Sequence, residues 1–369
     1  MRALVSAMNK LLEKDDHKVV TRALEKRDFH SLTDFFKVIF DVERDESYWD
    51  WKYFQNPYGE HISYVALDGD KVVGEVGAIP VKVKFGKESF MACHHCDFAV
   101  LPDYRKGGTF LKLLKLTIEG GTQRNLLFTY AFSTPVAFKV ATKLSKFRPV
   151  CSVKRWVLIL NPAPYLTKKL RIPLLARVVG HLCQRFVNLR LRKHYRPQRD
   201  NIIEIHQFDD RFDHFWKERK GDYGIMVVRD STYLNWRYTS NPVNKYKVFS
   251  YIAHGYVKGF IVLTATVDEV YRGIIMDIMV DPTDKIVLDS LLTAAMDYFY
   301  REKTDAIMLW LPENNPLVRE IEKWGFIRRD TPHNLSVHVL NHPDNWVNYD
   351  EYLKDHKNWY FTLGDSDYH

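Results

Sequence analysis

The stretch Val100-Leu101-Pro102-Asp103-Tyr104-Arg105-Lys106-Gly107-Gly108-Thr109-Phe110 joins two regular elements across a basic turn that contains two glycines. Residues 92–100 have the composition of a β-strand, and from Thr109 onward the apolar residues follow helical spacing. Gly107 and Gly108 let the backbone approach a ligand closely. Because the first N–H groups of a helix lack partners and its dipole favours negative charge, this junction predicts a phosphate site.

A second motif occurs twice in the chain. Tyr48-x-x-Trp51-Lys52-Tyr53-x-x-Asn56-Pro57 returns 185 residues later as Tyr233-x-x-Trp236-Arg237-Tyr238-x-x-Asn241-Pro242. Downstream, Asp97-x-x-Val100-x-Pro102 is followed by its counterpart Asp277-x-x-Val280-x-Pro282. A repeat of this length indicates two whole domains and not the short units of a solenoid. The aromatic residues of the motif are expected in the core, with a cleft lining as the alternative.

The two copies share one order of elements, which predicts a mixed α/β fold. In each copy a strand and a helix precede a meander of strands, and the strand-turn-helix junction, another strand and another helix follow. The expected divisions are an N-terminal amphipathic helix at 1–17, a first domain at 18–150, a basic helical connector at 151–200, a second domain at 201–330 and a C-terminal tail at 331–369.

The junction resembles the acyl-CoA loop of the GNAT (GCN5-related N-acetyltransferase) superfamily. Arg105 and Gly108, with the preceding Val100 and Pro102, match the family signature, whereas Phe110 stands where Gly or Ala is usual. The resemblance implies tandem GNAT folds, each with a largely antiparallel sheet flanked by helices. It implies acetyl-CoA or another acyl-CoA as co-substrate and direct acyl transfer to an amine. It is closest to the two-domain GNAT proteins associated with bacterial envelope or polysaccharide modification.

The second copy lacks the features of a phosphate turn. After Pro282 it reads Thr283-Asp284-Lys285-Ile286-Val287-Leu288, without arginine or glycine. We therefore assign the co-substrate to the first copy and a structural role to the second, although the late helix of the second copy keeps the family pattern better. By resemblance, the strand end supplies the pantetheine contacts and the turn supplies the phosphate contacts. The predicted set is Phe98, Ala99, Val100, Arg105, Lys106, Gly107, Gly108, Thr109 and Phe110.

Candidate catalytic groups precede the junction, in Cys93-His94-His95-Cys96-Asp97. Strand alternation places neighbouring residues on opposite faces, which argues against a metal site. His95 and Asp97 share a face and fit a base with its orienting partner, since histidine titrates near neutral pH. A structural role for Asp97 is equally open, because Asp277 repeats it. The family's usual tyrosine acid is missing, so Tyr130 or water is expected to protonate the thiolate.

The charge of the chain is concentrated in one segment. Residues 120–199 contain 17 Lys and Arg and no Asp or Glu, whereas the whole chain carries a net charge of +8, so the remainder is net acidic. Within this segment, Leu175–Arg192 predicts an amphipathic helix. This helix either packs on the domains or lies on an anionic membrane surface. Nucleic-acid binding is less favoured, because few aromatic residues accompany the cations.

Four cysteines make no disulfide framework in a chain of 369 residues, and no stretch is apolar enough to span a membrane. We expect a cytoplasmic protein, with a peripheral position on the inner face of the membrane as an option. The favoured function is an acyl-CoA-dependent N-acyltransferase acting on an amine, with a saccharide or a membrane-proximal molecule as acceptor. Two alternatives stay open: an aminoacyl-tRNA-dependent transferase of related fold, and a catalytically silent scaffold.

Overall fold

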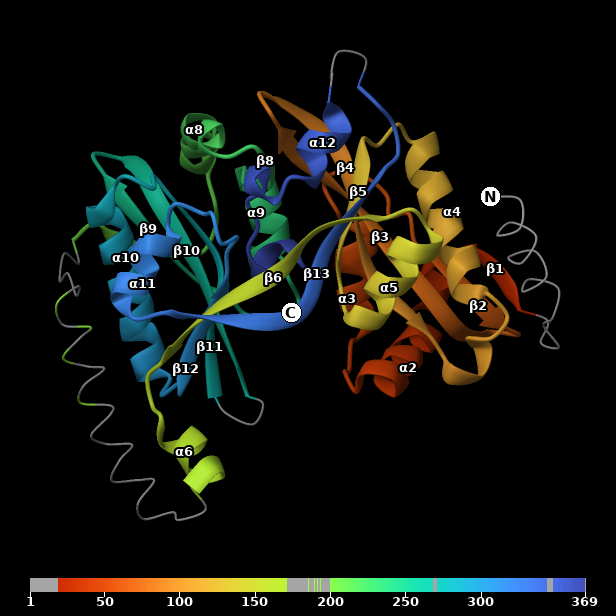
Figure 1. Ribbon diagram of the computed structural model, residues 1–369, viewed down its shortest axis with the longest axis horizontal. Coiled ribbons are helices and arrows are strands. Elements are labelled where there is room, and N and C mark those ends of the chain that lie inside the picture. Colours follow the sequence, from red (N-terminus) through yellow and green to blue (C-terminus); the bar gives the residue numbers. More distant parts are fainter. Residues whose placement is uncertain are drawn as a thin grey trace. The chain divides into compact units, whose positions relative to one another are not determined.

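The fold is that of a computed structural model, which describes residues 19–170, 200–267, 271–343 and 348–368, together with Arg185, Leu189, Leu191 and Lys193 (Figure 1). Its contacts divide the chain into two compact units. The first unit holds the described residues up to Cys151, Ser240–Val243 and those of Pro332–His356. The second unit holds those of Ser152–Thr239, Asn244–Thr331 and Lys357–His369.

The first unit is an open sheet with strand order β1-β2-β3-β4-β5-β13 and helices packed against it. All neighbours in this sheet are antiparallel except β4 and β5, which are parallel. Its strands are β1 (Val20–Ala23), β2 (Tyr64–Asp68), β3 (Lys71–Phe85), β4 (Glu88–Val100), β5 (Phe128–Ser133) and the end of β13 (Ile327–Val339). Its helices are α2 (Phe29–Phe40), α3 (Glu46–Trp49), α4 (Thr109–Gln123), α5 (Pro135–Leu144) and α12 (Tyr349–Lys354).

The second unit repeats this order of elements around a sheet ordered β6-β12-β11-β10-β9-β7. Among its described strands, the parallel pair is β11 with β12, which corresponds to the β4 and β5 pair. Its strands are β6 (Arg148–Ile159), β7 (Ile202–Glu204), β8 (Ile225–Val227), β9 (Lys247–Ala253), β10 (Tyr256–Val267), β11 (Tyr271–Val280) and β12 (Ala306–Trp310). Its helices are α6 (Ala163–Leu170), α8 (Asp210–Arg219), α9 (Ser231–Leu234), α10 (Lys285–Arg301) and α11 (Val318–Trp324). The predicted mixed α/β class with a mostly antiparallel sheet is confirmed.

Two of the predicted segments form structure that the sequence did not indicate. The segment 331–369 was predicted as a tail, yet Asn334–Val339 pairs with β5 in the first sheet. The segment 151–200 was predicted as a helical connector, yet its first residues form β6, which pairs with β12 in the second sheet. Strand formation prevails in the tail because Leu335 and Val337 alternate with polar residues and are fully buried. The predicted helices at 1–17 and at Leu175–Arg192 lie outside the continuously described residues.

The repeated aromatic motif forms the same local structure in both units. At the start of α3 the Tyr48 N–H donates to the Asp45 side chain, and at the start of α9 the Tyr233 N–H donates to the Asp230 side chain. Each of these short helices continues as a π-helical turn, at Asp50–Phe54 and Asn235–Thr239. The tryptophan and second tyrosine of each copy are buried, as the core interpretation predicted.

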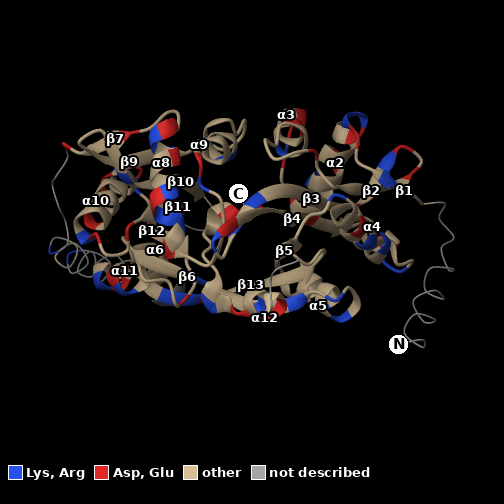
Figure 2. Cartoon of the chain, turned by 90° about the horizontal axis from the view of Figure 1, so that it is seen from above, with Lys and Arg blue, Asp and Glu red and all other residues tan. Residues whose placement is uncertain are grey.

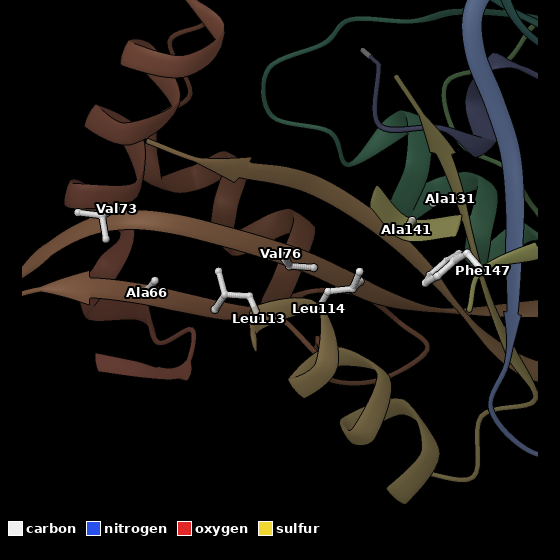
Figure 3. Close-up of a cluster of buried hydrophobic side chains, with 8 residues drawn as sticks. All are labelled: Ala66, Val73, Val76, Leu113, Leu114, Ala131, Ala141 and Phe147. Carbon is white, nitrogen blue, oxygen red and sulfur yellow. The ribbon is translucent and has the colours of Figure 1, made fainter. Parts of the chain in front are cut away.

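The core of the first unit fixes the start of α4 against the sheet. Figure 3 shows its central cluster, in which side chains from β2, β3, α4, β5 and α5 face one another. The members are Ala66, Val73, Val76, Leu113, Leu114, Ala131, Ala141 and Phe147. Phe98 and Phe110 pack against this cluster from the strand end and the helix start. The apolar spacing of α4 therefore holds the basic turn beside the end of β4.

Candidate functional site

A pocket of about 540 Å³ opens in the first unit at the junction quoted from the sequence. The end of α2, the end of β4, the basic turn, the start of α4 and the helix α5 contribute to its wall. The lining residues are Ile39, Phe40, Phe98, Ala99, Val100, Arg105, Lys106, Gly108, Phe110, Leu111, Thr134, Val136, Ala137, Val140 and Leu144. Its volume lies within the range of small-molecule sites. Seven of the nine residues predicted to contact a co-substrate line it, and Gly107 and Thr109 do not.

The basic turn presents an uncapped helix start to this pocket. Gly108 is the N-cap of α4 with φ of 76°, a left-handed conformation that favours glycine, and it has no side chain that could accept from the first N–H groups. Arg105 and Lys106 stand beside it in the wall. The Arg105 Nε donates to the Val100 carbonyl oxygen at 2.8 Å, which ties the turn to the end of β4. Two cations and unpaired N–H groups together suit a phosphate.

The other side of the pocket is the end of β4, where the strand is bulged. The register with β3 shifts between Glu75 and Gly77, and Asp97 in the bulge has φ of 54°. The parallel pairing of β4 with β5 covers Cys93 and His94. Phe98, Ala99 and Val100 follow this paired segment and line the pocket. The sheet therefore offers a strand end next to the helix start, as an extended ligand would need.

Aromatic and aliphatic side chains make up most of the wall. The Phe98 and Phe110 rings meet edge to face, with 5.9 Å between their centres. Phe110, which replaces the small residue of the family signature, therefore contributes an apolar surface to the site. Thr134, Arg105 and Lys106 supply the polar side chains of the lining. Such a site suits a ligand with an apolar arm and an anionic end.

His95 does not fit the role of base that the sequence predicted. Its side chain is buried, and Nδ1 pairs with the Thr129 hydroxyl while Nε2 pairs with the Thr117 hydroxyl at 2.8 Å. Burial lowers the pKa of His95 to about 3, with further lowering from His94 and His338. Strand alternation put His95 on one face but could not show that α4 covers that face. The histidine is thus a hydrogen-bonded core residue outside the pocket wall.

Asp97 lies at the bulge, with its side chain 8% exposed. Its Oδ2 pairs with the Lys52 ammonium and accepts from the Tyr53 hydroxyl at 2.5 Å. The Tyr53 hydroxyl also lies 2.8 Å from Oε1 of Glu75, which is fully buried. Burial raises the pKa of Glu75 well above its usual value, and the neighbouring Asp97 charge adds to this.

Sequence reasoning found Asp97 but missed the other members of this cluster. Lys52 and Tyr53 belong to the repeated motif, so their recurrence was the available signal. Glu75 is an acid within the apolar run of β3, where an unpaired charge is costly to bury. Gly77 makes room for the cluster, because a Cβ there would lie 2.4 Å from the Tyr53 hydroxyl.

Tyr130, the predicted proton donor, lies on β5 opposite Val337 of β13. Its ring stacks on the His94 imidazole with 4.9 Å between centres, and it is buried. It is not part of the pocket wall. Asp97 is likewise not part of the pocket wall, but it lies at the bulge next to the strand end that lines the pocket, whereas His95 and Tyr130 lie in the core.

The corresponding place in the second unit is occupied by the chain itself. Asp284 caps α10 by accepting from the Val287 N–H at 3.1 Å, where α4 has the uncapped Gly108. The Tyr360 hydroxyl donates to the carbonyl oxygen of Ile278, the residue after Asp277 on β11. The C-terminal residues Trp359–Ser366 that carry this tyrosine are buried. A capped helix and a filled strand end leave little room for a phosphate-bearing ligand there.

Comparisons with known proteins agree with this geometry. Residues 20–140 match the family model described as an acetyltransferase (GNAT) domain. No curated protein matches the sequence. Among solved structures, a probable N-acyltransferase from Enterococcus faecalis superposes with a TM-score of 0.60 at 11% identity, covering 88% of this chain and 72% of that one.

Two further solved structures are similar. A GCN5-related N-acetyltransferase from Anabaena variabilis has a TM-score of 0.60 at 10% identity and covers 88% of this chain and 73% of its own. The N-myristoyltransferase of Saccharomyces cerevisiae with bound myristoyl-CoA has a TM-score of 0.57 at 10% identity, with 87% and 79% covered. At these identities the likeness establishes the fold.

Proposed function

We propose that this chain, whose residues 20–140 match the family model of a GNAT acetyltransferase domain, is an acyltransferase that transfers an acyl group directly from an acyl-CoA thioester to an amine. The observation that carries this proposal is the pocket of the first unit. It joins an uncapped helix start, two cations and a bulged strand end in one wall.

The pocket supports a particular placement of acyl-CoA. The pyrophosphate would lie at the start of α4, where Arg105, Lys106 and the free N–H groups attract negative charge. The pantetheine arm would then follow Phe98–Val100, with α5 on its other side. A backbone N–H of the bulged strand would polarise the thioester carbonyl, because the oxygen gains negative charge as the amine attacks. Gly107 and Thr109 would contribute through the conformation of the turn.

The base that we propose is Asp97. It is the carboxylate at the bulge, next in sequence to the first pocket residue of β4. The amine must lose a proton as its nitrogen bonds to the acyl carbon, and a positioned carboxylate can accept that proton. Lys52 and Tyr53 hold one oxygen of Asp97 in place. Protonation of the departing thiolate by Tyr130 or by water remains a prediction.

For the acceptor we propose an amine carried at or near a membrane surface. The rim of the pocket exposes apolar side chains, with Phe40 44%, Val136 77% and Leu144 46% exposed. Val136 and Leu144 lie on α5, where Lys139 and Lys143 are also exposed. This helix carries basic but no acidic residues (Figure 2). Apolar side chains flanked by lysines favour an anionic lipid surface. No helix among the described residues is long and apolar enough to cross a membrane.

Calorimetric titration with acetyl-CoA and with lauroyl-CoA tests the proposal. We expect both to bind and the double substitution Arg105→Glu with Gly108→Glu to weaken binding at least tenfold, since it places two negative charges at the phosphate site. The matched control is Lys285→Glu, the same kind of charge change at the start of α10, which should leave binding unchanged. Absence of binding to the wild-type protein would overturn the proposal and favour the scaffold or the tRNA-dependent alternative.

A further inference from the structure

The hydroxyl of Tyr53 lies between two carboxyl groups. It is 2.8 Å from Oε1 of Glu75 and 2.5 Å from Oδ2 of Asp97. A neutral phenol has one proton to donate, so it can donate to only one of two carboxylates. The second contact is a hydrogen bond only if that carboxyl group carries a proton and donates it to the Tyr53 oxygen. The geometry therefore requires one protonated carboxyl group in this cluster.

The position of Lys52 decides which carboxyl group it is. The Lys52 ammonium pairs with Asp97 Oδ2, and the lysine side chain is 4% exposed. Glu75 is 0% exposed, and its Oε2 has no hydrogen-bond partner among the described residues. A buried carboxylate without a cation is costly, whereas a buried carboxylic acid is much less so. The chain of donors thus runs from Glu75 to Tyr53 to Asp97.

The second unit supplies an internal comparison. Tyr238, the counterpart of Tyr53, donates to Asp277 Oδ2 at 3.0 Å. Glu75 pairs across the sheet with Ala99, and the equivalent position opposite Met279 is Phe260. The tyrosine and aspartate are thus shared by both units, whereas an acid at this strand position occurs in the first unit and phenylalanine takes its place in the second. Packing alone can be achieved with phenylalanine at this place, so Glu75 serves another purpose.

We propose that Glu75 is a protonated positioning residue that donates to Tyr53 and so fixes the Tyr53 hydroxyl as a donor to the Asp97 carboxylate. This inference rests on the proposed function, in which Asp97 accepts the amine proton. In that step the nitrogen bonds to the acyl carbon, the C–S bond breaks with its electron pair on sulfur, and the proton goes to Asp97. Glu75 keeps its own proton throughout. Its effect is to hold Asp97 in one orientation at the bulge.

Infrared difference spectroscopy of the full chain at pH 7.5 tests the protonation state without any acyl transfer. Wild type minus Glu75→Gln should show the C=O stretch of a carboxylic acid, shifted in D2O. Loss of a carboxylate band instead would overturn the proposal. Tyr53→Phe should keep the acid band but move it to higher frequency, because the hydrogen bond to Tyr53 is gone. The matched control Tyr238→Phe should leave this band in place.

Kinetics then test the positioning role. Glu75→Leu should lower kcat about tenfold, because the Tyr53 proton is no longer directed to Asp97. Glu75→Gln should recover most of that loss, since its amide is neutral and can donate to Tyr53. KM for acetyl-CoA should stay within about twofold. Equal losses in both variants would contradict the proposal. If the wild type neither binds nor uses acyl-CoA, the proposed function fails while the infrared result still decides the state of Glu75.

Discussion

The two units place a tyrosine against an aspartate in the same way but differ in what surrounds that pair. In the first unit Lys52 and Glu75 complete the cluster, and a pocket lies beside the bulged strand. In the second unit Arg229 lies between Asp277 and Asp365, and the C-terminal segment fills the strand end. The tyrosine and aspartate are therefore part of the fold, whereas the open strand end and the acid at the Glu75 position are what a reactive site would add.

The charges of the second cluster explain how the chain can fill its own site. Arg229 is fully buried, and its Nη2 donates to Asp365 at 2.6 Å while its Nε donates to Asp277 at 3.2 Å. Arg237, the counterpart of Lys52, donates instead to the carbonyl oxygens of Gly364 and Ser366. Breaking a buried ion pair costs about 3–5 kcal/mol. The C-terminal segment is therefore held by interactions that a ligand would have to replace.

The largest expected effect separates the two aspartates. Asp97→Asn should lower kcat roughly a hundredfold or more, as expected for loss of a general base, and should also lower the unfolding free energy, because the buried Lys52 ammonium loses its partner. Asp277→Asn should leave kcat near wild type but lower the unfolding free energy by about 3 kcal/mol, because Arg229 loses a partner. Steady-state kinetics and urea unfolding of both variants measure this. A similar fall in kcat for both would show that the two aspartates have one structural role.

Two glycines next to the tyrosines provide a second contrast. A Cβ on Gly77 would lie 2.4 Å from the Tyr53 hydroxyl, and a Cβ on Gly364 would lie 2.1 Å from the Tyr238 hydroxyl. Each substitution by alanine should lower stability by about 1–3 kcal/mol, since a rigid ring must move. Only Gly77→Ala should also lower kcat, because it displaces the base. Thermal unfolding and steady-state kinetics of both variants check this. A lower kcat for Gly364→Ala would contradict the expected difference between the two glycines.

Phe110 and Ile286 occupy the second position of α4 and of α10. Phe110→Ala should weaken binding of lauroyl-CoA by roughly 1 kcal/mol, because the ring contributes apolar contact to the pocket wall. Ile286, which is 59% exposed, should tolerate alanine without a change in binding. Calorimetry compares the two. Tighter binding by Phe110→Ala would mean that the ring obstructs the site instead of lining it.

The smallest effect concerns pH and His95, whose counterpart 180 residues later in the second unit is the apolar Ile275. The folded pKa of His95 is about 3 and its ordinary value is 6.5, so between these values the unfolded state binds more protons. The contribution of neutral His95 to the unfolding free energy is therefore fully present above about pH 6.5. It falls as the pH decreases, with a slope approaching about 1.4 kcal/mol per pH unit. His95→Gln should reduce that slope. Urea unfolding at pH 7.5 and 4.5 measures it, and an unchanged slope would contradict the assignment.

Much of the pocket could be predicted from the sequence because its parts are local. The basic turn, the glycine N-cap and the apolar helix are neighbours in the chain, so their chemistry is visible in one stretch. The residues around the proposed base could not be predicted in the same way. His95 is enclosed by Thr117 and Thr129, which are distant in sequence, and Glu75 reaches Asp97 only through Tyr53.

The strand pairing of the segment 331–369 was missed for a related reason. Asn334–Val339 alternates as a strand should, but its partner β5 lies about 200 residues earlier in the chain. Nothing local to Trp359–Ser366 indicates that these residues pack on β11, since their partners Ile278, Arg229 and Arg237 come from three other segments. Long-range pairing of this kind depends on the assembled fold.

Hydrogen exchange measured by mass spectrometry, with and without acetyl-CoA, shows in one experiment which of the two units binds the co-substrate. We expect acetyl-CoA to slow exchange at residues 98–111, around the end of β4 and the start of α4, and to leave residues 278–288 of the second unit unchanged. Protection at 278–288 without protection at 98–111 would contradict this expectation and would move the co-substrate to the second unit.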